Sequence, residues 1–277
     1  ATHMFYKPSI KLTIRIMRDL VELVGLLDKT KLKGSGILRW IIEPDSKMEQ
    51  LYLAIAEKKV YTDEEGEALF GGAGSNGTSL TSVKSKLKER LLDSFFLLQF
   101  KEANFTSRQK AFFECYKKWA TIMTLLSRNA KVIGIDLLER LLRHTTHFEF
   151  TELTLDILRV LRLQYSIVDG DIKKYEAVKA QCEQYEGIWM MENKAEKYYS
   201  ELMVQFTNSK STQLEVVNQA KVCYEELAPY MEQCKSFKLH MFGRLVQMMI
   251  YNGENDYVNT AKLCEDAIKF FDQKDYD

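Results

Sequence analysis

Residues 235–271 read KSFKLHMFGRLVQMMIYNGENDYVNTAKLCEDAIKFF and contain the clearest helical pattern in the chain. Apolar residues recur in it at three- and four-residue steps on both sides of a short break at Asn252 and Gly253. Such spacing places the apolar side chains on one face of a helix. The stretch therefore predicts two antiparallel helices, 235–251 and 255–271, joined by a tight turn.

The same pattern occurs three more times upstream. The pairs of apolar-periodic stretches are 107–127 with 130–146, 150–168 with 171–188, and 193–208 with 212–231. Helix-breaking residues separate the members, among them Asn129, Gly170 and the serines Ser209 and Ser211. The pairs begin about 42 residues apart, a period typical of stacked helical hairpins. Residues 106–277 are thus predicted to form an α-solenoid of four antiparallel hairpins.

The last pair resembles a tetratricopeptide repeat. In that family an aromatic residue lies late in the first helix, and aromatic and small residues recur along the second. The matching positions here are Tyr251, Tyr257, Thr260, Ala261, Cys264, Ala267 and Ile268. Arg244, Gln247 and Met248 stand where the family prefers Trp, Leu and Gly, and the period exceeds the family's about 34 residues. The resemblance implies a right-handed superhelix with a concave binding surface.

Residues 4–105 do not show the period of about 42 residues and are predicted to form a distinct N-terminal helical segment. Asp45 or Ser46 is suited to begin a helix that runs to about residue 59. Thr62 and Glu65 have the spacing of a capping box, which opens a short helix ending at Gly71. A glycine-rich loop, 71–79, is predicted to be flexible, and a helix over 80–100 follows it.

Composition narrows the class of protein. The chain has 39 basic and 39 acidic residues, and this balance argues against long-range attraction to nucleic acid or to an anionic membrane. No charge-free apolar run of about 18 residues occurs, so no membrane span is predicted. The five cysteines are dispersed and form no Cys-x-x-Cys pair, which predicts a reducing compartment and a cytoplasmic location.

The sequence contains few motifs that resemble nucleotide-binding, metal-binding or catalytic sites. Residues 72–77 match Gly-x-Gly-x-x-Gly, but that motif binds pyrophosphate only between a strand and a helix, and helices are predicted on both sides here. His144 and His147 lie three residues apart near the end of a predicted helix, where a basic side chain also favours the helix dipole. We therefore predict no metal, no cofactor and no enzymatic activity. An enzyme with an active site between the N-terminal segment and the repeats is a weaker hypothesis, because no catalytic motif supports it.

The predicted function is a protein-interaction scaffold whose concave groove holds a peptide or helix of another protein. Helix position selects Arg159, Arg162, Tyr198, Gln205 and Arg244 as partner-binding candidates. Tyrosines also recur at helical spacing, and the pattern does not separate those that pack between hairpins from those that line a groove. They are Tyr165, Tyr175, Tyr185, Tyr198, Tyr199, Tyr224, Tyr230, Tyr251 and Tyr257. Dimerisation through the C-terminal hairpin is a further option.

The alternative is a transcription regulator in which residues 48–100 read DNA like a helix-turn-helix. Its candidate DNA-binding residues lie on the helix after the glycine-rich loop: Ser82, Lys84, Ser85, Lys86, Lys88 and Arg90. Two features oppose it. The turn has about nine residues where such motifs use three or four, and the preceding helix carries Asp63, Glu64, Glu65 and Glu67.

Overall fold

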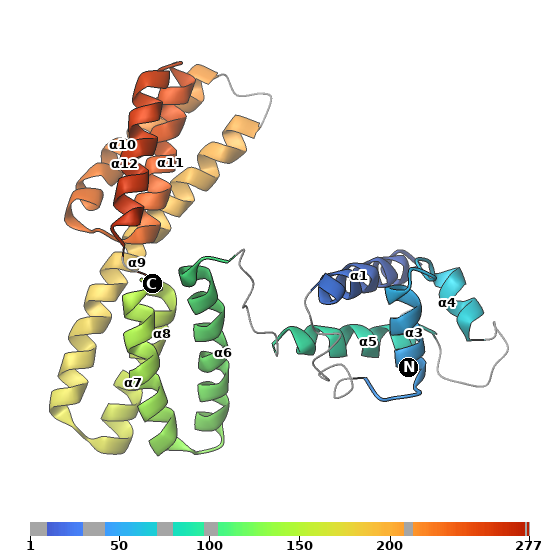
Figure 1. Cartoon of the computed structure of the whole chain (residues 1–277). Helices are drawn as coiled ribbons and strands as arrows, with labels where there is room; N and C mark the ends of the chain where they lie inside the picture. Colours follow the sequence, from blue (N-terminus) through green and yellow to red (C-terminus); the bar gives the residue numbers. More distant parts are fainter. Residues whose placement is uncertain are drawn as a thin grey trace, which may run out of the picture. The chain divides into compact units, whose positions relative to one another are not determined.

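The computed structural model describes residues 10–29, 42–70, 80–96, 105–207, 213–274 and 276 (Figure 1). Within these ranges all regular structure is helical, which confirms the predicted all-α class. The chain separates into two compact units, residues 1–99 (unit 1) and residues 100–277 (unit 2). The predicted glycine-rich loop at 71–79 and the predicted break at Ser209 and Ser211 lie outside the described residues.

Unit 1 contains four described helices: α1 (Ile10–Lys29), α3 (Lys47–Ala56), α4 (Asp63–Leu69) and α5 (Leu80–Phe95). Ser46 begins α3, because its Oγ accepts a hydrogen bond from the backbone N–H of Glu49 at 3.1 Å. The predicted capping box at the start of α4 is confirmed. Glu65 N–H donates to Thr62 Oγ1 at 3.3 Å, and Thr62 N–H donates to the Glu65 carboxylate at 3.0 Å.

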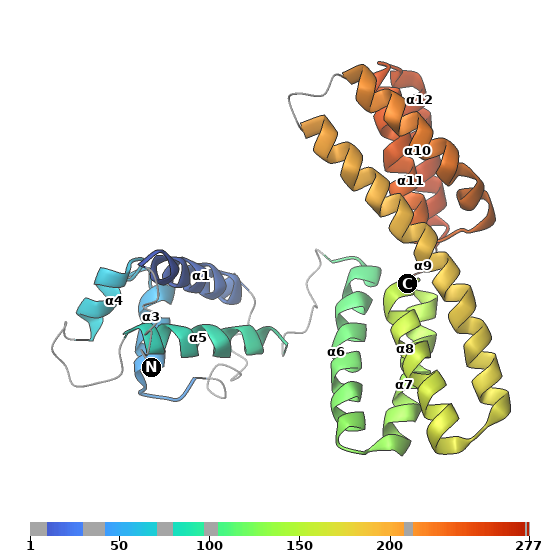
Figure 2. The same cartoon turned by 180° about the vertical axis from the view of Figure 1, so that it is seen from behind.

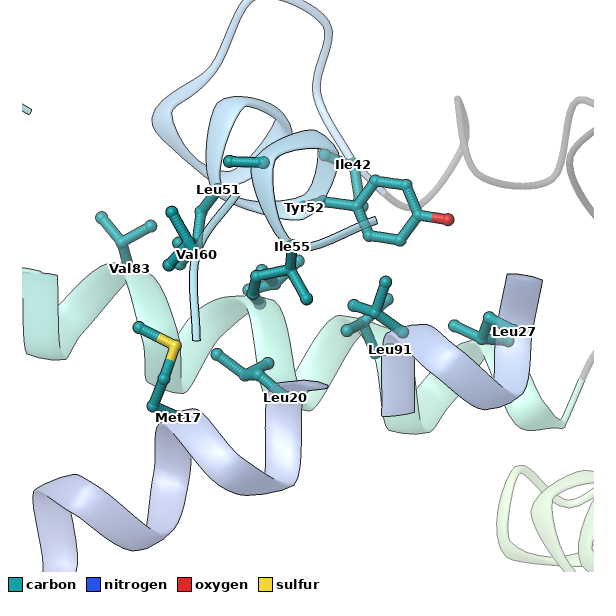
Figure 3. Close-up of a cluster of buried hydrophobic side chains, with 13 residues drawn as sticks. Met17, Leu20, Leu27, Ile42, Leu51, Tyr52, Ile55, Val60, Val83 and Leu91 are labelled. Atoms are coloured by element: carbon teal, nitrogen blue, oxygen red, sulfur yellow. The ribbon is translucent and has the colours of Figure 1, made fainter. Parts of the chain in front are cut away.

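The core of unit 1 lies where α1, α3 and α5 meet (Figure 3). Met17 and Leu20 come from α1, Leu51 and Ile55 from α3, and Leu91 from α5, and all five are buried. The apolar stripe of α5 follows the three- and four-residue steps that the sequence shows. One of its buried positions, however, holds Lys84, which is described with the candidate sites below.

Unit 2 is a succession of helices in which each helix packs against the next one along the chain. The helices are α6 (Ser107–Ser127), α7 (Lys131–His147), α8 (Thr151–Gln164), the π-helical turn η2 (Tyr165–Asp169), α9 (Ile172–Thr207), α10 (Gln213–Gln233), α11 (Phe237–Gly253) and α12 (Tyr257–Asp272). Helix α9 also packs against α11. The predicted breaks at Asn129 and Gly170 are confirmed, with φ of 64° and 57° in the left-handed region.

One predicted break is wrong. The apolar pattern predicts that one helix ends at Ile188 and another begins at Asn193. Helix α9 instead continues through both positions and is 36 residues, or about 54 Å, long (Figures 1 and 2). The second helix of the second predicted pair and the first helix of the third pair are therefore one helix. Gly187 and Asn193 are weak helix formers, but a penalty of about 0.5–1 kcal/mol each is small beside the packing of α9 on both sides of them.

Helix α9 belongs to two cores. Its first half contributes Val178 and Cys182 to a core shared with α6, α7 and α8, which together form the proximal lobe. Its second half contributes Ala195 and Leu202 to a core shared with α10 and α11, which form the distal lobe together with α12. Both lobes of unit 2 are thus built on one continuous helix. Among the helices in the described ranges, none combines the length and the apolar character needed to cross a membrane.

Candidate partner-binding groove

The distal lobe contains a groove of about 580 Å³ between α9, α10 and α11, called here the α9–α11 groove. Helix α9 supplies Tyr199, Met203 and Phe206, which follow one another at four- and three-residue steps and therefore lie on one face of the helix. Phe206 is 66% exposed, so its ring is accessible to a bound molecule.

Helices α10 and α11 complete the walls. Val216 and Val217 come from the first turns of α10 and are buried, so they form the floor. The side chains from α11 are Leu245, Met248, Met249 and Asn252. Gly253 ends α11 within contact of Val217, where a Cβ atom would lie 2.2 Å from a methyl group of that valine. The surface is mainly apolar and includes three methionines.

The polar side chains in the groove are few and mostly occupied. Gln213 donates from Nε2 to the carbonyl oxygen of Gly253 at 3.0 Å, and Asn252 accepts from the Thr260 hydroxyl at 3.1 Å. Tyr199 packs its ring against Phe242, with ring centroids 5.7 Å apart. The walls therefore offer apolar contact and very little hydrogen bonding to a bound molecule.

The five partner-binding candidates from the sequence are not brought together, and none lines this groove. Arg159 and Arg162 lie on α8, where Arg159 pairs with Asp156 at 3.7 Å and with Glu186 at 3.6 Å. Gln205 lies on α9 and is partly buried. Arg244 lines a different depression of about 490 Å³ between α11 and α12, with its guanidinium carbon 5.1 Å from the ring centroid of Phe270.

Tyr198 lies beside the groove residue Tyr199 but is engaged elsewhere. Its hydroxyl and the Lys194 amine both donate to the Glu226 carboxylate on α10. This hydrogen bond raises the pKa of Tyr198, and the one from Lys194 lowers the pKa of Glu226. The recurrence of tyrosines in the sequence identified Tyr199 as a residue that either packs between hairpins or lines a groove. Nothing in the sequence indicated that Met203, Met248 and Met249 line a common surface.

The DNA-binding candidates on α5 divide into two groups. Lys84 is 0% exposed and its amine pairs with Asp63 at 2.6 Å, while Lys88 is part-buried and pairs with Asp19 at 2.5 Å. Ser82 is partly buried. The burial of Lys84 corrects its assignment as a phosphate contact, because a buried amine cannot reach a DNA backbone.

The remaining candidates, Ser85, Lys86 and Arg90, are exposed. Two acidic residues of the same helix, Glu89 and Asp93, are exposed as well. Positive and negative charges therefore both lie on the solvent side of α5. Such a mixture does not favour contact with a polyanion.

Metal binding has no support in the described residues. They contain no group of three or more His, Cys, Asp or Glu side chains arranged to hold an ion. His144 and His147 are exposed in the last turn of α7, and His147 packs edge-on against Phe148, with ring centroids 4.7 Å apart.

The chain was also compared with known proteins. No protein-family model, no curated protein and no solved structure matches it.

Proposed function

We propose that this protein is an interaction scaffold that binds an amphipathic helix of another protein in the α9–α11 groove. The observation that carries the proposal is a mainly apolar groove of about 580 Å³ with three methionines in its walls. Methionine side chains are flexible and polarisable, so they adapt to the apolar face of a partner helix.

Two features favour a helix over an extended peptide. The groove offers few free hydrogen-bonding groups, so an occupant must satisfy its own backbone, as a helix does. Its walls extend from Tyr199 to Phe206 on α9 and from Leu245 to Gly253 on α11, which is about 10–12 Å, or two helical turns. This length suits anchor residues at positions i, i+3, i+4 and i+7 of a partner.

The layered packing of unit 2 supports a finer proposal, that its helices form a right-handed solenoid similar to tetratricopeptide repeats, with one helix shared between the second and third pairs. We propose a binding role without catalysis. The five free, dispersed thiols support a reducing compartment, and hence a cytoplasmic site of action.

The test replaces a groove methionine by a charged residue. A display library of amphipathic helical peptides about four turns long is selected against the full chain, and the selected peptides are titrated against variants. Met203→Glu places a carboxylate in the apolar wall, so we expect affinity to fall at least about tenfold, or about 1.4 kcal/mol.

Met190→Glu is the matched control, because Met190 lies on the same helix, is 65% exposed and does not line the groove. We expect the selected peptides to bind this variant as they bind the wild type. Selection of no peptide, or equal binding to the Met203→Glu variant, would refute the proposal.

A further inference from the structure

A second cleft, of about 350 Å³, lies where the proximal and distal lobes meet, and is called here the junction cleft. Phe112 and Tyr116 of α6 and Phe150, which precedes α8, contribute aromatic rings to its wall. Phe112 is 40% exposed and Tyr116 is 38% exposed, so these two rings remain accessible to a bound molecule. Phe150 is buried, and its ring centroid lies 4.9 Å from the guanidinium carbon of Arg108. This cleft is separate from the α9–α11 groove, with which it shares no lining residue.

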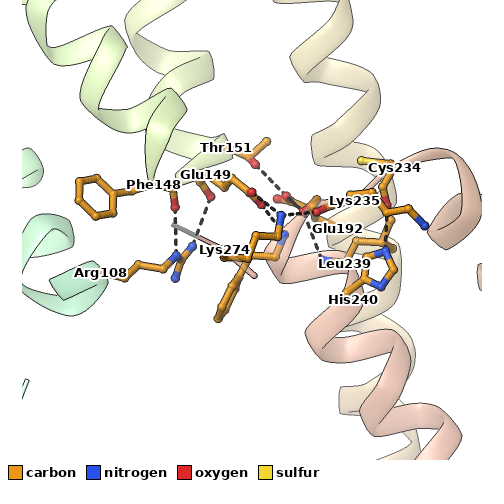
Figure 4. A network of polar contacts seen from close by, with 12 residues as sticks. Arg108, Phe148, Glu149, Thr151, Glu192, Cys234, Lys235, Leu239, His240 and Lys274 are labelled. Atoms are coloured by element: carbon orange, nitrogen blue, oxygen red, sulfur yellow. Dashed lines mark hydrogen bonds and ion pairs between the residues drawn. The ribbon is translucent and has the colours of Figure 1, made fainter. Parts of the chain in front are cut away.

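Hydrogen bonds across the cleft fix its shape. Arg108 of α6 donates to the carbonyl oxygens of Phe148 and Glu149, at 3.0 and 3.3 Å, just after α7. Its guanidinium carbon lies 4.0 Å from the ring centroid of Phe237, the first residue of α11. The Glu149 carboxylate in turn accepts from the backbone N–H of Phe237 at 2.7 Å. The two lobes are therefore held together around the cleft (Figure 4).

Glu192, in the middle of α9, lines the cleft and is only 1% exposed. The hydroxyl of Thr151 donates to its Oε1 at 2.7 Å, and the hydroxyl of Ser236 donates to the same oxygen. Figure 4 shows Glu192 between Thr151 and the start of α11. Among the described residues no donor bonds to Oε2 and no cation lies within ion-pair distance of Glu192. A nearly buried carboxylate thus has one oxygen without a partner in the part of the chain that the structure describes.

The other charges at the junction are already engaged. Lys274 pairs with Glu149, and Lys238 pairs with Glu152 at 3.0 Å and with Glu196 at 2.7 Å. Among the described residues that line the cleft, the cations of Arg108 and Lys238 face the three carboxylates of Glu149, Glu152 and Glu192, so one negative charge is in excess. Burial raises the pKa of Glu192, and the hydroxyl donors and the nearby Lys238 oppose this rise.

We propose that the junction cleft binds an organic ammonium group, held between the exposed rings of Phe112 and Tyr116 and the oxygen of Glu192 that has no partner among the described residues. An ammonium supplies the hydrogen-bond donor that Oε2 of Glu192 lacks and offsets the excess negative charge of the cleft, and aromatic faces attract such cations. A divalent metal ion fits less well, because it requires several oxygen ligands and Glu192 presents one oxygen. The ammonium group belongs to a free alkylamine or to a lysine side chain, which share this chemistry.

Met241 also lines the cleft and provides a direct reporter. In the full chain labelled with ¹³C at the methionine methyl groups, we expect cadaverine and N-acetyl-lysine methylamide to shift the Met241 signal saturably. The exposed Met190 serves as the internal reference. The neutral analogue 1-pentanol and potassium chloride at equal ionic strength are expected to leave Met241 unchanged.

Glu192→Gln removes the charge but keeps an oxygen that can accept from Thr151 and Ser236, so the fold is expected to persist and is checked by circular dichroism. We expect this variant to bind amines at least about tenfold more weakly. Glu201→Gln, on the exposed side of the same helix, is the matched control and is expected to bind as the wild type does.

Binding of cadaverine alone would assign a free amine as the ligand, and preference for the lysyl compound would assign a protein side chain. Either result supports the cleft. Absence of a saturable Met241 shift, or equal binding by the folded Glu192→Gln variant, would overturn the proposal. The groove variant Met203→Glu is expected to leave the Met241 response unchanged, so a failure of one site is distinguishable from a failure of the other.

Discussion

A lysine amine that is shielded from water requires an anionic partner, and Lys84 has one in Asp63. Asp63 is the first residue of α4, where a carboxylate also favours the helix dipole. The pair joins α4 to α5 inside unit 1. Lysines with the same spacing in the sequence therefore have different roles, because Lys84 is buried and Lys86 is exposed.

Lys84→Ala removes the amine and leaves both a void and a carboxylate without its cation. We expect the free energy of unfolding of unit 1 to fall by about 2–4 kcal/mol, measured by urea denaturation. Lys86→Ala, two residues away and exposed, is expected to change it by less than about 0.5 kcal/mol. Equal effects of the two substitutions would contradict a structural role for Lys84.

The burial of Lys84 could not be predicted from its neighbours in the sequence. Its partner lies 21 residues away, and the apolar periodicity of α5 does not distinguish a buried lysine from a surface one. The caps at Ser46 and Thr62 were predictable, because the acceptor side chain and the donor N–H are separated by three residues.

For the helices, too, some boundaries could be predicted from nearby residues and others could not. Starts and ends at Ser107, Asn129 and Gly170 follow from local residue chemistry. The continuity of α9 does not, because it depends on two cores that contact Val178 and Leu202 from different parts of the chain. The α9–α11 groove was missed for this reason, since the spacing of Met203 and Met248 defines a face of each helix but not which faces meet.

Replacing two glycines of unit 2 by alanine compares the effect of helix propensity on stability with the effect of side-chain packing. No atom lies within 4 Å of a Cβ added at Gly187 of α9, so Gly187→Ala is expected to stabilise unit 2 by about 0.5–1 kcal/mol through helix propensity. Gly253→Ala in α11 would place its Cβ 2.2 Å from a methyl group of the buried Val217.

We expect Gly253→Ala to lower stability by about 1–3 kcal/mol, because valine has little rotamer freedom with which to yield. Thermal unfolding monitored by circular dichroism compares the two variants. A lower melting temperature for Gly187→Ala than for the wild type would contradict the expectation that alanine stabilises this stretch of α9 through its higher helix propensity.

The two lobes of unit 2 are connected at the junction, where Arg108 packs over Phe237 and Glu149 accepts from the Phe237 N–H. Glu192 accepts there from the hydroxyls of Thr151 and Ser236. Because burial raises the pKa of Glu192 above its ordinary value of 4.5, the folded protein holds this proton more tightly than the unfolded chain does. The resulting stabilisation is complete below pH 4.5 and is lost as the pH rises through the raised value.

Urea unfolding of the wild type and of Glu192→Gln from about pH 4 to about pH 8 measures this effect. With rising pH, the wild type is expected to lose unfolding free energy relative to the variant, which has no proton to release at this position. Parallel curves for the two proteins would show that Glu192 has the same proton affinity in the folded and unfolded states.

The length of α9 has a consequence for the kinds of change this chain can tolerate. Each residue of an α-helix advances the chain by 100°, so inserting or deleting one residue between Glu192 and Ala195 would rotate the second half of α9, with Leu202 and the distal core around it, by more than a quarter turn relative to the first half. A loop would absorb such a change. In α9 the number of residues between the two cores sets the rotation of one lobe relative to the other about the helix axis. Only an insertion close to a whole number of helical turns would preserve this rotation.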